Sequence, residues 1–139
     1  MVQKKYKEIL IIYSDFYSSI SKNLLDGAET YLKKKKINFE KKRVDGSLEL
    51  PIVLSKFYKK YSGFILLGCV IKGQTDHYQI VKDICLSQIY SIACENSLPL
   101  ATAILTVENY DQALERSDTK KKNLGQRAAK VCCDLIEIL

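Results

Sequence analysis

Residues 63–81 read GFILLGCVIKGQTDHYQIV, and they contain the transition that defines the class of this protein. The first nine residues form the most hydrophobic run of the chain, and they predict a strand buried on both faces in the middle of a sheet. Gly73 allows the chain to turn, and residues 78–96 predict a helix. A buried strand that feeds into a helix is the repeating unit of α/β proteins with a parallel sheet.

The same alternation of strands and helices extends along the rest of the chain. Apolar runs predict further strands over residues 8–13, 37–44 (an edge strand) and 98–105. Apolar residues at helical spacing predict a helix with Ser18 or Ser19 as its N-cap, and further helices over residues 49–60, 109–117 and 121–138. This order predicts one domain over residues 1–139, a three-layer, flavodoxin-like α/β sandwich with a four-stranded parallel sheet and helices on both faces.

The composition excludes several classes of protein. Of the 139 residues, 47% are apolar and 27% are charged, which is the range of soluble globular domains. No run approaches the ~20 apolar residues that span a bilayer, and the N-terminal apolar stretch is too short for a signal peptide and lacks a cleavage site. We therefore expect a cytoplasmic protein with no membrane partner.

The cysteines and the single histidine argue against a disulfide framework and against a metal centre. The chain has five cysteines, an odd number, with no C-x-x-C pair. We expect them to be small, buried, reduced side chains, and we expect no metal.

The positive net charge leaves three interpretations open. The formal net charge is +6, and lysines cluster at residues 33–36, 41–42 and 120–122. A basic chain suits a nucleic-acid-binding module, but no aromatic residue interleaves these clusters, which lie at predicted helix ends and loops. A solvated lysine surface with no nucleic-acid partner is the favoured interpretation, and an anionic small substrate also fits the sign of the charge.

In a doubly wound parallel sheet, ligands bind outside the carboxyl ends of the strands. This rule selects four loops, at residues 14–17, 45–49, 70–77 and 105–109. In the third of them, the amides of Gln74, Thr75 and Asp76 precede a helix N-terminus, where unpaired N–H groups and the helix dipole favour an anion. His77 follows, as either a proton carrier for the bound molecule or a structural histidine that caps the helix.

The other loops supply further candidates, each with a plainer alternative. Phe16 is either a core residue or a platform for a planar ring. The backbone around Ser47 and Leu48 suits the edge of a heterocycle, whereas Glu49 also fits a carboxylate favoured by the helix dipole. Arg116 is either a solvated cation or a phosphate ligand. Because the chain has no G-x-G-x-x-G, Walker or G-x-S-x-G motif, we favour a cofactor-free reaction between a planar and a phosphorylated substrate.

Four motifs, in order and with the right spacing, resemble those of the 6,7-dimethyl-8-ribityllumazine synthase family over nearly the whole chain. GCVIKGQTDHYQIV (68–81) resembles the family's G-x-V-I-[RK]-G-x-T-x-H-[FY], and VDGSLELP (44–51) resembles its V-P-G-[AS]-[FW]-E-[IL]-P. SDFYSSISKNLLDGA (14–28) resembles R-F-N-x-x-[IV]-x-x-x-L-L-x-G-A. ILTVENYDQALERSDTKKKN (104–123) resembles the stretch that ends E-R-[AS]-G-T-K-x-G-N. One motif alone is a weak signal, but four together are specific.

The resemblance implies a reaction and a set of site residues. The family condenses 5-amino-6-(D-ribitylamino)uracil with L-3,4-dihydroxy-2-butanone 4-phosphate in riboflavin biosynthesis, and releases phosphate and water without a metal or organic cofactor. By resemblance, Phe16 stacks on the pyrimidine and His77 carries the proton. The implied pyrimidine and ribityl contacts are Ser47, Leu48, Glu49, Cys69, Val70, Ile71 and Thr102. The implied phosphate ligands are Gln74, Thr75 and Arg116.

The chain departs from the family pattern in its later part. Family members usually carry an aromatic residue at the position of Thr102, a lysine at that of Leu124 and a carboxylate at that of Arg127. Because Leu124 and Arg127 are three residues apart on one predicted helix, they share a face, and we hypothesise that Arg127 replaces the missing cation. The same departures motivate an alternative function, that of a catalytically weakened relative that binds a flavin- or lumazine-like ligand.

The resemblance also implies self-association. Family active sites lie between neighbouring subunits of a pentamer, and some members build a 60-mer shell of twelve pentamers. Shell-forming members tend to carry glycine where this chain has Lys122, and the chain offers little N-terminal arm before its first strand. We therefore expect a homopentamer or a decamer rather than a shell, with riboflavin synthase as a further candidate partner.

Overall fold

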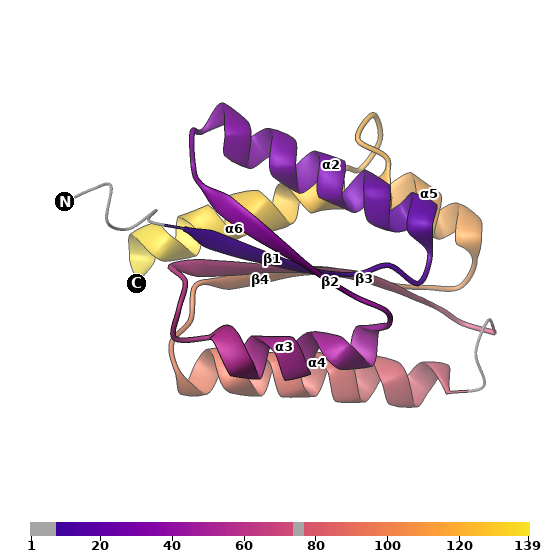
Figure 1. Ribbon diagram of the computed structural model, residues 1–139. Helices are drawn as coiled ribbons and strands as arrows, with labels where there is room; N and C mark the ends of the chain where they lie inside the picture. Colours follow the sequence, from indigo (N-terminus) through magenta and orange to yellow (C-terminus); the bar gives the residue numbers. More distant parts are fainter. Residues whose placement is uncertain (1–7, 74–76) are drawn as a thin grey trace.

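The computed structural model describes residues 8–73 and 77–139. Strands and helices alternate along the chain (Figure 1). The elements are β1 (Ile9–Ser14), α2 (Ser18–Lys34), β2 (Phe39–Val44), the 3-10 turn η1 (Ser47–Glu49), α3 (Leu50–Phe57), β3 (Gly63–Ile71), α4 (Tyr78–Glu95), β4 (Leu100–Val107), α5 (Tyr110–Ser117) and α6 (Leu124–Ile138).

The four strands form one sheet in the order β2-β1-β3-β4, and every neighbouring pair is parallel. β3 pairs with β1 on one side and with β4 on the other, so that Ile65 lies between Ile11 and Ala101. The predicted central position of β3 and the predicted edge position of β2 are both confirmed. All four carboxyl ends meet at one edge of the sheet because the strands are parallel.

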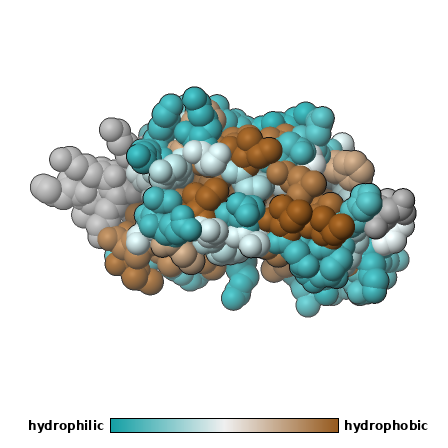
Figure 2. Space-filling model, turned by 90° about the horizontal axis from the view of Figure 1, so that it is seen from below, coloured by the Kyte–Doolittle hydropathy of each residue, from teal (hydrophilic) through white to brown (hydrophobic). Residues whose placement is uncertain are grey.

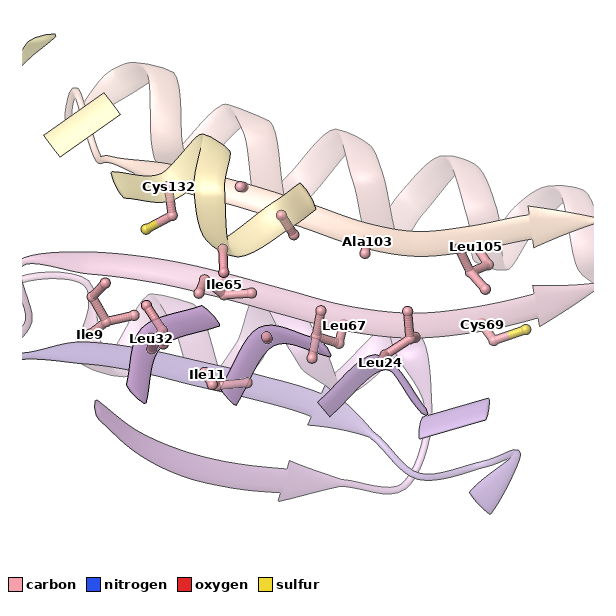
Figure 3. Packing of buried hydrophobic residues seen from close by; sticks show 14 of the residues in the cluster. Ile9, Ile11, Leu24, Leu32, Ile65, Leu67, Cys69, Ala103, Leu105 and Cys132 are labelled. Carbon is pink, nitrogen blue, oxygen red and sulfur yellow. The ribbon is translucent and has the colours of Figure 1, made fainter. Parts of the chain in front are cut away.

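The alternation of side chains along β3 joins the sheet to a helical layer on each face. Ile65 and Leu67 pack into the cluster formed with α2, α5 and α6, whereas Phe64 and Leu66 pack into the cluster formed with α3 and α4. Figure 3 shows the first cluster, in which Leu24 of α2 faces Leu67 across the layer boundary. Since all nine residues of β3 are buried, the strand needs apolar side chains on both faces, and the predicted three-layer sandwich is confirmed.

Helices α2 and α6 approach each other closely at two glycines. A Cβ atom added to Gly125 would lie 2.1 Å from the carbonyl oxygen of Leu24, and one added to Gly27 would lie 2.2 Å from Asn123 Oδ1. Backbone therefore packs directly on backbone where α6 begins, and a side chain at either position would force the helices apart. This contact fixes the first turn of α6, which carries Leu124 and Arg127.

Some local expectations need correction. The N-cap of α2 is Tyr17, in an extended conformation and with no side-chain cap, whereas Ser18 is already helical. Four of the five cysteines are buried as expected, but Cys94 is exposed. Within residues 8–73 and 77–139, no helix is long and apolar enough to cross a membrane.

Candidate active site

A hollow lies at the carboxyl edge of the sheet, where the loops after β1 and β2 meet the end of β3. It is called the Phe16 hollow below, and it has a volume of about 210 Å³. Its lining combines segments that are far apart in the sequence: Phe16, Tyr17, Gly46, Ser47, Leu48, Glu49, Cys69, Val70 and Val81. Ligand pockets usually measure about 300–1,000 Å³, so this hollow is small for two reacting molecules.

Phe16 forms an open aromatic wall of the hollow. Its side chain is 64% exposed, so the interpretation as a core residue is wrong. The rings of Phe16 and Tyr17 form a T-shaped pair, with centroids 4.9 Å apart and an interplanar angle of 84°. A T-shaped contact covers at most one face of a ring, so the exposed ring of Phe16 keeps a face available to another planar group.

The turn Ser47–Glu49 forms another part of the lining. The backbone N–H of Gly46 donates to Glu49 Oε1 over 2.9 Å, so Glu49 closes the turn as a first-turn carboxylate. Ser47 is buried, and a Cβ atom added to Gly68 would lie 3.1 Å from its Oγ. The absence of a side chain at Gly68 therefore lets this turn sit directly against β3.

An exposed cation ties the two loops of the hollow together. The guanidinium of Arg43 donates to Asp15, which follows β1, and to Asp45, which follows β2, each over 3.0 Å. Hydrogen bonding to Asp15 raises the pKa of Arg43 further. Because these pairs are exposed, they orient the loops rather than add much to stability.

The end of β3 makes an uncharged floor. Cys69 and Val70 both line the hollow, and burial raises the pKa of the Cys69 thiol to about 12. Cys69 therefore stays a neutral thiol at physiological pH, unlike a catalytic cysteine. Ile71, the third predicted contact of this strand, is buried and is not among the residues that line the hollow.

The predicted anion loop lies next to this hollow along the chain. Gly73 has a positive φ of 83°, which suits the turn expected after β3. The predicted phosphate ligands Gln74 and Thr75 lie outside the described residues. His77 is exposed and is the N-cap residue of α4, and it is not among the side chains that line the Phe16 hollow.

A second hollow lies beside the edge strand β4 and is lined by Thr102, Leu124 and Arg127, three residues that depart from the family pattern. It is called the β4-edge hollow below, and its volume is about 410 Å³. α4, β4 and α6 contribute its lining: Tyr90, Leu100, Ala101, Thr102, Ala103, Leu124, Arg127, Ala128, Val131 and Leu135. Leu124 and Arg127 thus share a face of α6, as predicted. Thr102 is 2.8 Å from the hydroxyl of Tyr90, measured from Oγ1 to Oη.

The structure therefore divides the predicted site residues into two groups within one chain. Phe16, the turn Ser47–Glu49 and the floor residues of β3 meet in the Phe16 hollow, whereas Thr102 and Arg127 meet in the β4-edge hollow. Arg116 lines neither of them. It is half-buried in the last turn of α5, and no ion pair or hydrogen bond of its side chain is found in the described part of the chain.

Two tyrosines belong to these hollows although the sequence did not single them out. Tyr17 lines the Phe16 hollow, and its buried hydroxyl has no hydrogen-bond partner among the described residues. Burial and the nearby Cys69 raise the pKa of Tyr17. Its place directly after Phe16 was a usable signal, whereas Tyr90 lies within a long helix and gave none.

No group of three or more metal-ligating side chains comes together in the described residues. The buried thiols are not poised as ligands either, since burial raises the pKa of Cys69, Cys85, Cys132 and Cys133.

Comparison with known proteins identifies close relatives over the whole chain. A family model described as 6,7-dimethyl-8-ribityllumazine synthase matches residues 6–139. The protein of that name from Wigglesworthia glossinidia brevipalpis is 38% identical over 144 residues, covering 99% of this chain and 94% of the relative. The one from Paramagnetospirillum magneticum is 36% identical over 140 residues, covering 94% and 93%. The one from Buchnera aphidicola subsp. Baizongia pistaciae is 37% identical over 142 residues, covering 98% and 89%.

Proposed function

The chain belongs to the 6,7-dimethyl-8-ribityllumazine synthase family, and on this premise we propose how its own residues carry out the condensation. It is a transferase of riboflavin biosynthesis that acts on small molecules and assembles as an oligomer. The substrates are 5-amino-6-(D-ribitylamino)uracil and L-3,4-dihydroxy-2-butanone 4-phosphate, and the reaction releases phosphate and water.

The observation that carries the residue assignment is the Phe16 hollow itself. Three separate motifs of the resemblance meet there, at the edge of the sheet where ligands bind in such folds. The pyrimidine ring stacks on the exposed face of Phe16. The backbone of Ser47 and Leu48, with Glu49, holds the uracil edge and the ribityl chain, and the neutral thiol of Cys69 adds an uncharged floor.

The chemistry then depends mainly on holding two reactants together. The amine of the pyrimidine attacks the ketone and expels one water to give a Schiff base, phosphate leaves by elimination, and the ring closes with loss of a second water. Positioning of this kind lowers a barrier by up to ~7–11 kcal/mol in favourable cases. No metal or organic cofactor takes part in these steps.

The phosphate and proton-transfer roles follow the same premise. Gln74 and Thr75 bind the phosphate, and Arg116 supplies a cation. His77, at the start of α4, carries the proton. His77→Ala should slow turnover without ending it, because positioning remains, and a variant at the wild-type rate across roughly pH 6–8 would refute this role.

The site is completed by a neighbouring copy of the chain. The small volume of the Phe16 hollow supports this arrangement, since it leaves one side of a bound pyrimidine uncovered. The β4-edge hollow of the neighbour supplies the second wall, which includes Thr102. Arg127 provides the cation that family members usually carry at the position of Leu124. Arg127 is exposed, and in the described part of the chain it forms no ion pair that would compete for a phosphate.

Assembly as a homopentamer or a decamer is favoured over a 60-mer shell. Figure 2 shows hydrophobic side chains on the face of α3 and α4, and these two helices carry the exposed isoleucines Ile52, Ile80 and Ile84. Exposed apolar side chains on these helices suit burial between copies. Light scattering tests the preference, and a particle near sixty subunits would contradict it. We place the enzyme in the cytoplasm, with riboflavin synthase as a candidate partner that takes up the product.

Turnover of the two substrates tests the function. Formation of the lumazine chromophore should match phosphate release one for one. Phe16→Ala should raise the KM for the pyrimidine about tenfold or more, because a stacking face is lost, and leave the KM for the ketone phosphate nearly unchanged. Ile138→Ala, which removes an equally exposed apolar side chain outside both hollows, is the control.

Two outcomes would contradict this proposal. Ligand binding without any product would instead indicate a weakened relative that only binds a lumazine-like molecule. Equal KM values for wild type and Phe16→Ala would show that the pyrimidine does not stack on this ring.

A further inference from the structure

One large aromatic side chain stands in the β4-edge hollow. Tyr90 projects from the middle of α4 and is 42% exposed. The hydrogen bond between its hydroxyl and Thr102 ties the far end of the side chain to β4. The ring therefore has a defined position between helix and strand, although much of it remains open to solvent.

The contact with Thr102 places Tyr90 next to the position at which family members usually carry an aromatic residue. Tyr90 reaches toward residue 102 from α4, and an aromatic side chain at residue 102 would reach toward the same space from β4. Because the hydroxyls of Tyr90 and Thr102 lie only 2.8 Å apart, a larger side chain at residue 102 would crowd the ring of Tyr90 in its present position. The short side chain of Thr102 leaves this position open to Tyr90.

The surroundings of the ring suit a planar, polar ligand. Leu124 and Val131 give the hollow an apolar side, and Arg127 places a cation within the same lining. The Phe16 hollow has an exposed ring and the carboxylate of Glu49, and its lining includes no lysine or arginine. Both hollows thus have an aromatic lining, and of the two only the β4-edge hollow has a cation in its lining.

We propose that Tyr90 supplies the aromatic face that closes over the pyrimidine bound in the Phe16 hollow of a neighbouring copy, and that Thr102 is its positioning residue. This assignment rests on the proposed function. The aromatic ring that family members usually carry at residue 102 of the strand is replaced in this chain by the ring of residue 90 on the helix. The substrate contact in the second half of the site is then retained in this chain by a different residue.

Binding of an unreactive ligand tests the assignment separately from turnover. The probe is the pyrimidine substrate with a nitro group in place of its reacting 5-amino group, titrated into the assembled protein by calorimetry. Tyr90→Leu, which keeps an apolar side chain for folding, should weaken binding about tenfold, whereas Tyr90→Phe, which keeps the ring but loses the hydrogen bond to Thr102, should weaken it only about two- to threefold. Tyr31→Ala, a half-buried tyrosine of α2 outside both hollows, should bind like wild type.

The double variant Tyr90→Ala/Thr102→Phe is the sharpest arm of this experiment. It returns one ring to the strand, so it should bind the probe several-fold more tightly than Tyr90→Ala alone. Light scattering on every variant confirms the same assembly.

Each result decides between the assignment and the proposed function. Product formation by wild type together with unchanged probe binding by Tyr90→Leu would overturn the role of Tyr90 and leave the function standing. A double variant no better than Tyr90→Ala would overturn the replacement of residue 102 by residue 90. Wild-type protein that neither binds the probe nor forms product would overturn both.

Discussion

The two hollows of this protein differ in how they relate to the family pattern. Phe16, Ser47 and Glu49, which match the motifs, line the Phe16 hollow at the carboxyl edge of the sheet. Thr102, Leu124 and Arg127, which depart from the family pattern, line the β4-edge hollow on the side of an edge strand. Within the β4-edge hollow, Tyr90 contacts Thr102, and Arg127 lies on the same face of α6 as Leu124. These three departures thus lie in one hollow, where the ring of Tyr90 lies beside Thr102 and the guanidinium of Arg127 lies on the same helix face as Leu124.

The two hollows also depend on the fold in different ways. Gly125→Ala should therefore have the largest effect on the free energy of unfolding. The added Cβ atom would lie 2.1 Å from the Leu24 carbonyl oxygen, so α6 must move and take the β4-edge hollow with it. We expect a loss of about 3 kcal/mol in the free energy of unfolding, measured by denaturant titration. Gly46→Ala, in the Phe16 hollow, should change it by less than about 0.5 kcal/mol. Equal losses in the free energy of unfolding for Gly125→Ala and Gly46→Ala would contradict this difference between the two hollows.

Arg127→Ala tests whether the two hollows differ in charge, because only the lining of the β4-edge hollow includes an arginine. If Arg127 provides the cation of the β4-edge hollow, its loss should raise the KM for the ketone phosphate about tenfold. Lys130→Ala is the control, because Lys130 lies one turn further along α6 and is paired with Asp134 over 2.8 Å. Unchanged substrate affinity and turnover in Arg127→Ala would refute its role as replacement cation.

The neutral floor of the Phe16 hollow predicts a smaller effect, at alkaline pH. Burial raises the pKa of Cys69 from 9.0 to about 12, so the thiol ionises in the unfolded chain before it ionises in the folded one. Its contribution to stability is complete below pH 9 and is lost as the pH rises toward 12. This single group lowers the free energy of unfolding by up to about 1.4 kcal/mol per pH unit in that window.

Thermal unfolding from pH 8 to pH 10.5 under reducing conditions measures this loss. Cys69→Ala should lose stability less steeply than wild type, whereas Cys94→Ala, at the exposed cysteine, serves as the control with the wild-type slope. Identical slopes for wild type and Cys69→Ala would contradict the raised pKa.

Much of the fold could be predicted because its signals are local. The apolar run 63–71 matches β3 from end to end, since a strand buried on both faces requires an unbroken apolar sequence. The start of α2 was mispredicted, because Ser18 and Ser19 have the side chains of N-cap residues but the backbone places Tyr17 there. The close approach of Gly27 and Gly125 depends on helix packing, which no local pattern encodes.

The site could be predicted less completely, because part of it depends on contacts between distant segments that no local pattern encodes. Phe16, Ser47, Leu48 and Glu49 follow strands at the carboxyl edge, and topology alone brings them together. Tyr90 could not be found in this way, because only the folded chain brings α4 against Thr102. That Thr102 and Arg127 lie in a hollow apart from Phe16 also required the structure.

The central claim is that the two hollows are halves of one site in neighbouring copies. Mixing of two inactive variants, Phe16→Asp and Arg127→Glu, tests it directly, when both are unfolded and reassembled together in equal amounts. If each site takes one half from each of two copies, random mixing leaves about a quarter of the sites with both halves intact, and about a quarter of the wild-type activity should return. A mixture no more active than the mean of the two separate variants would contradict the account.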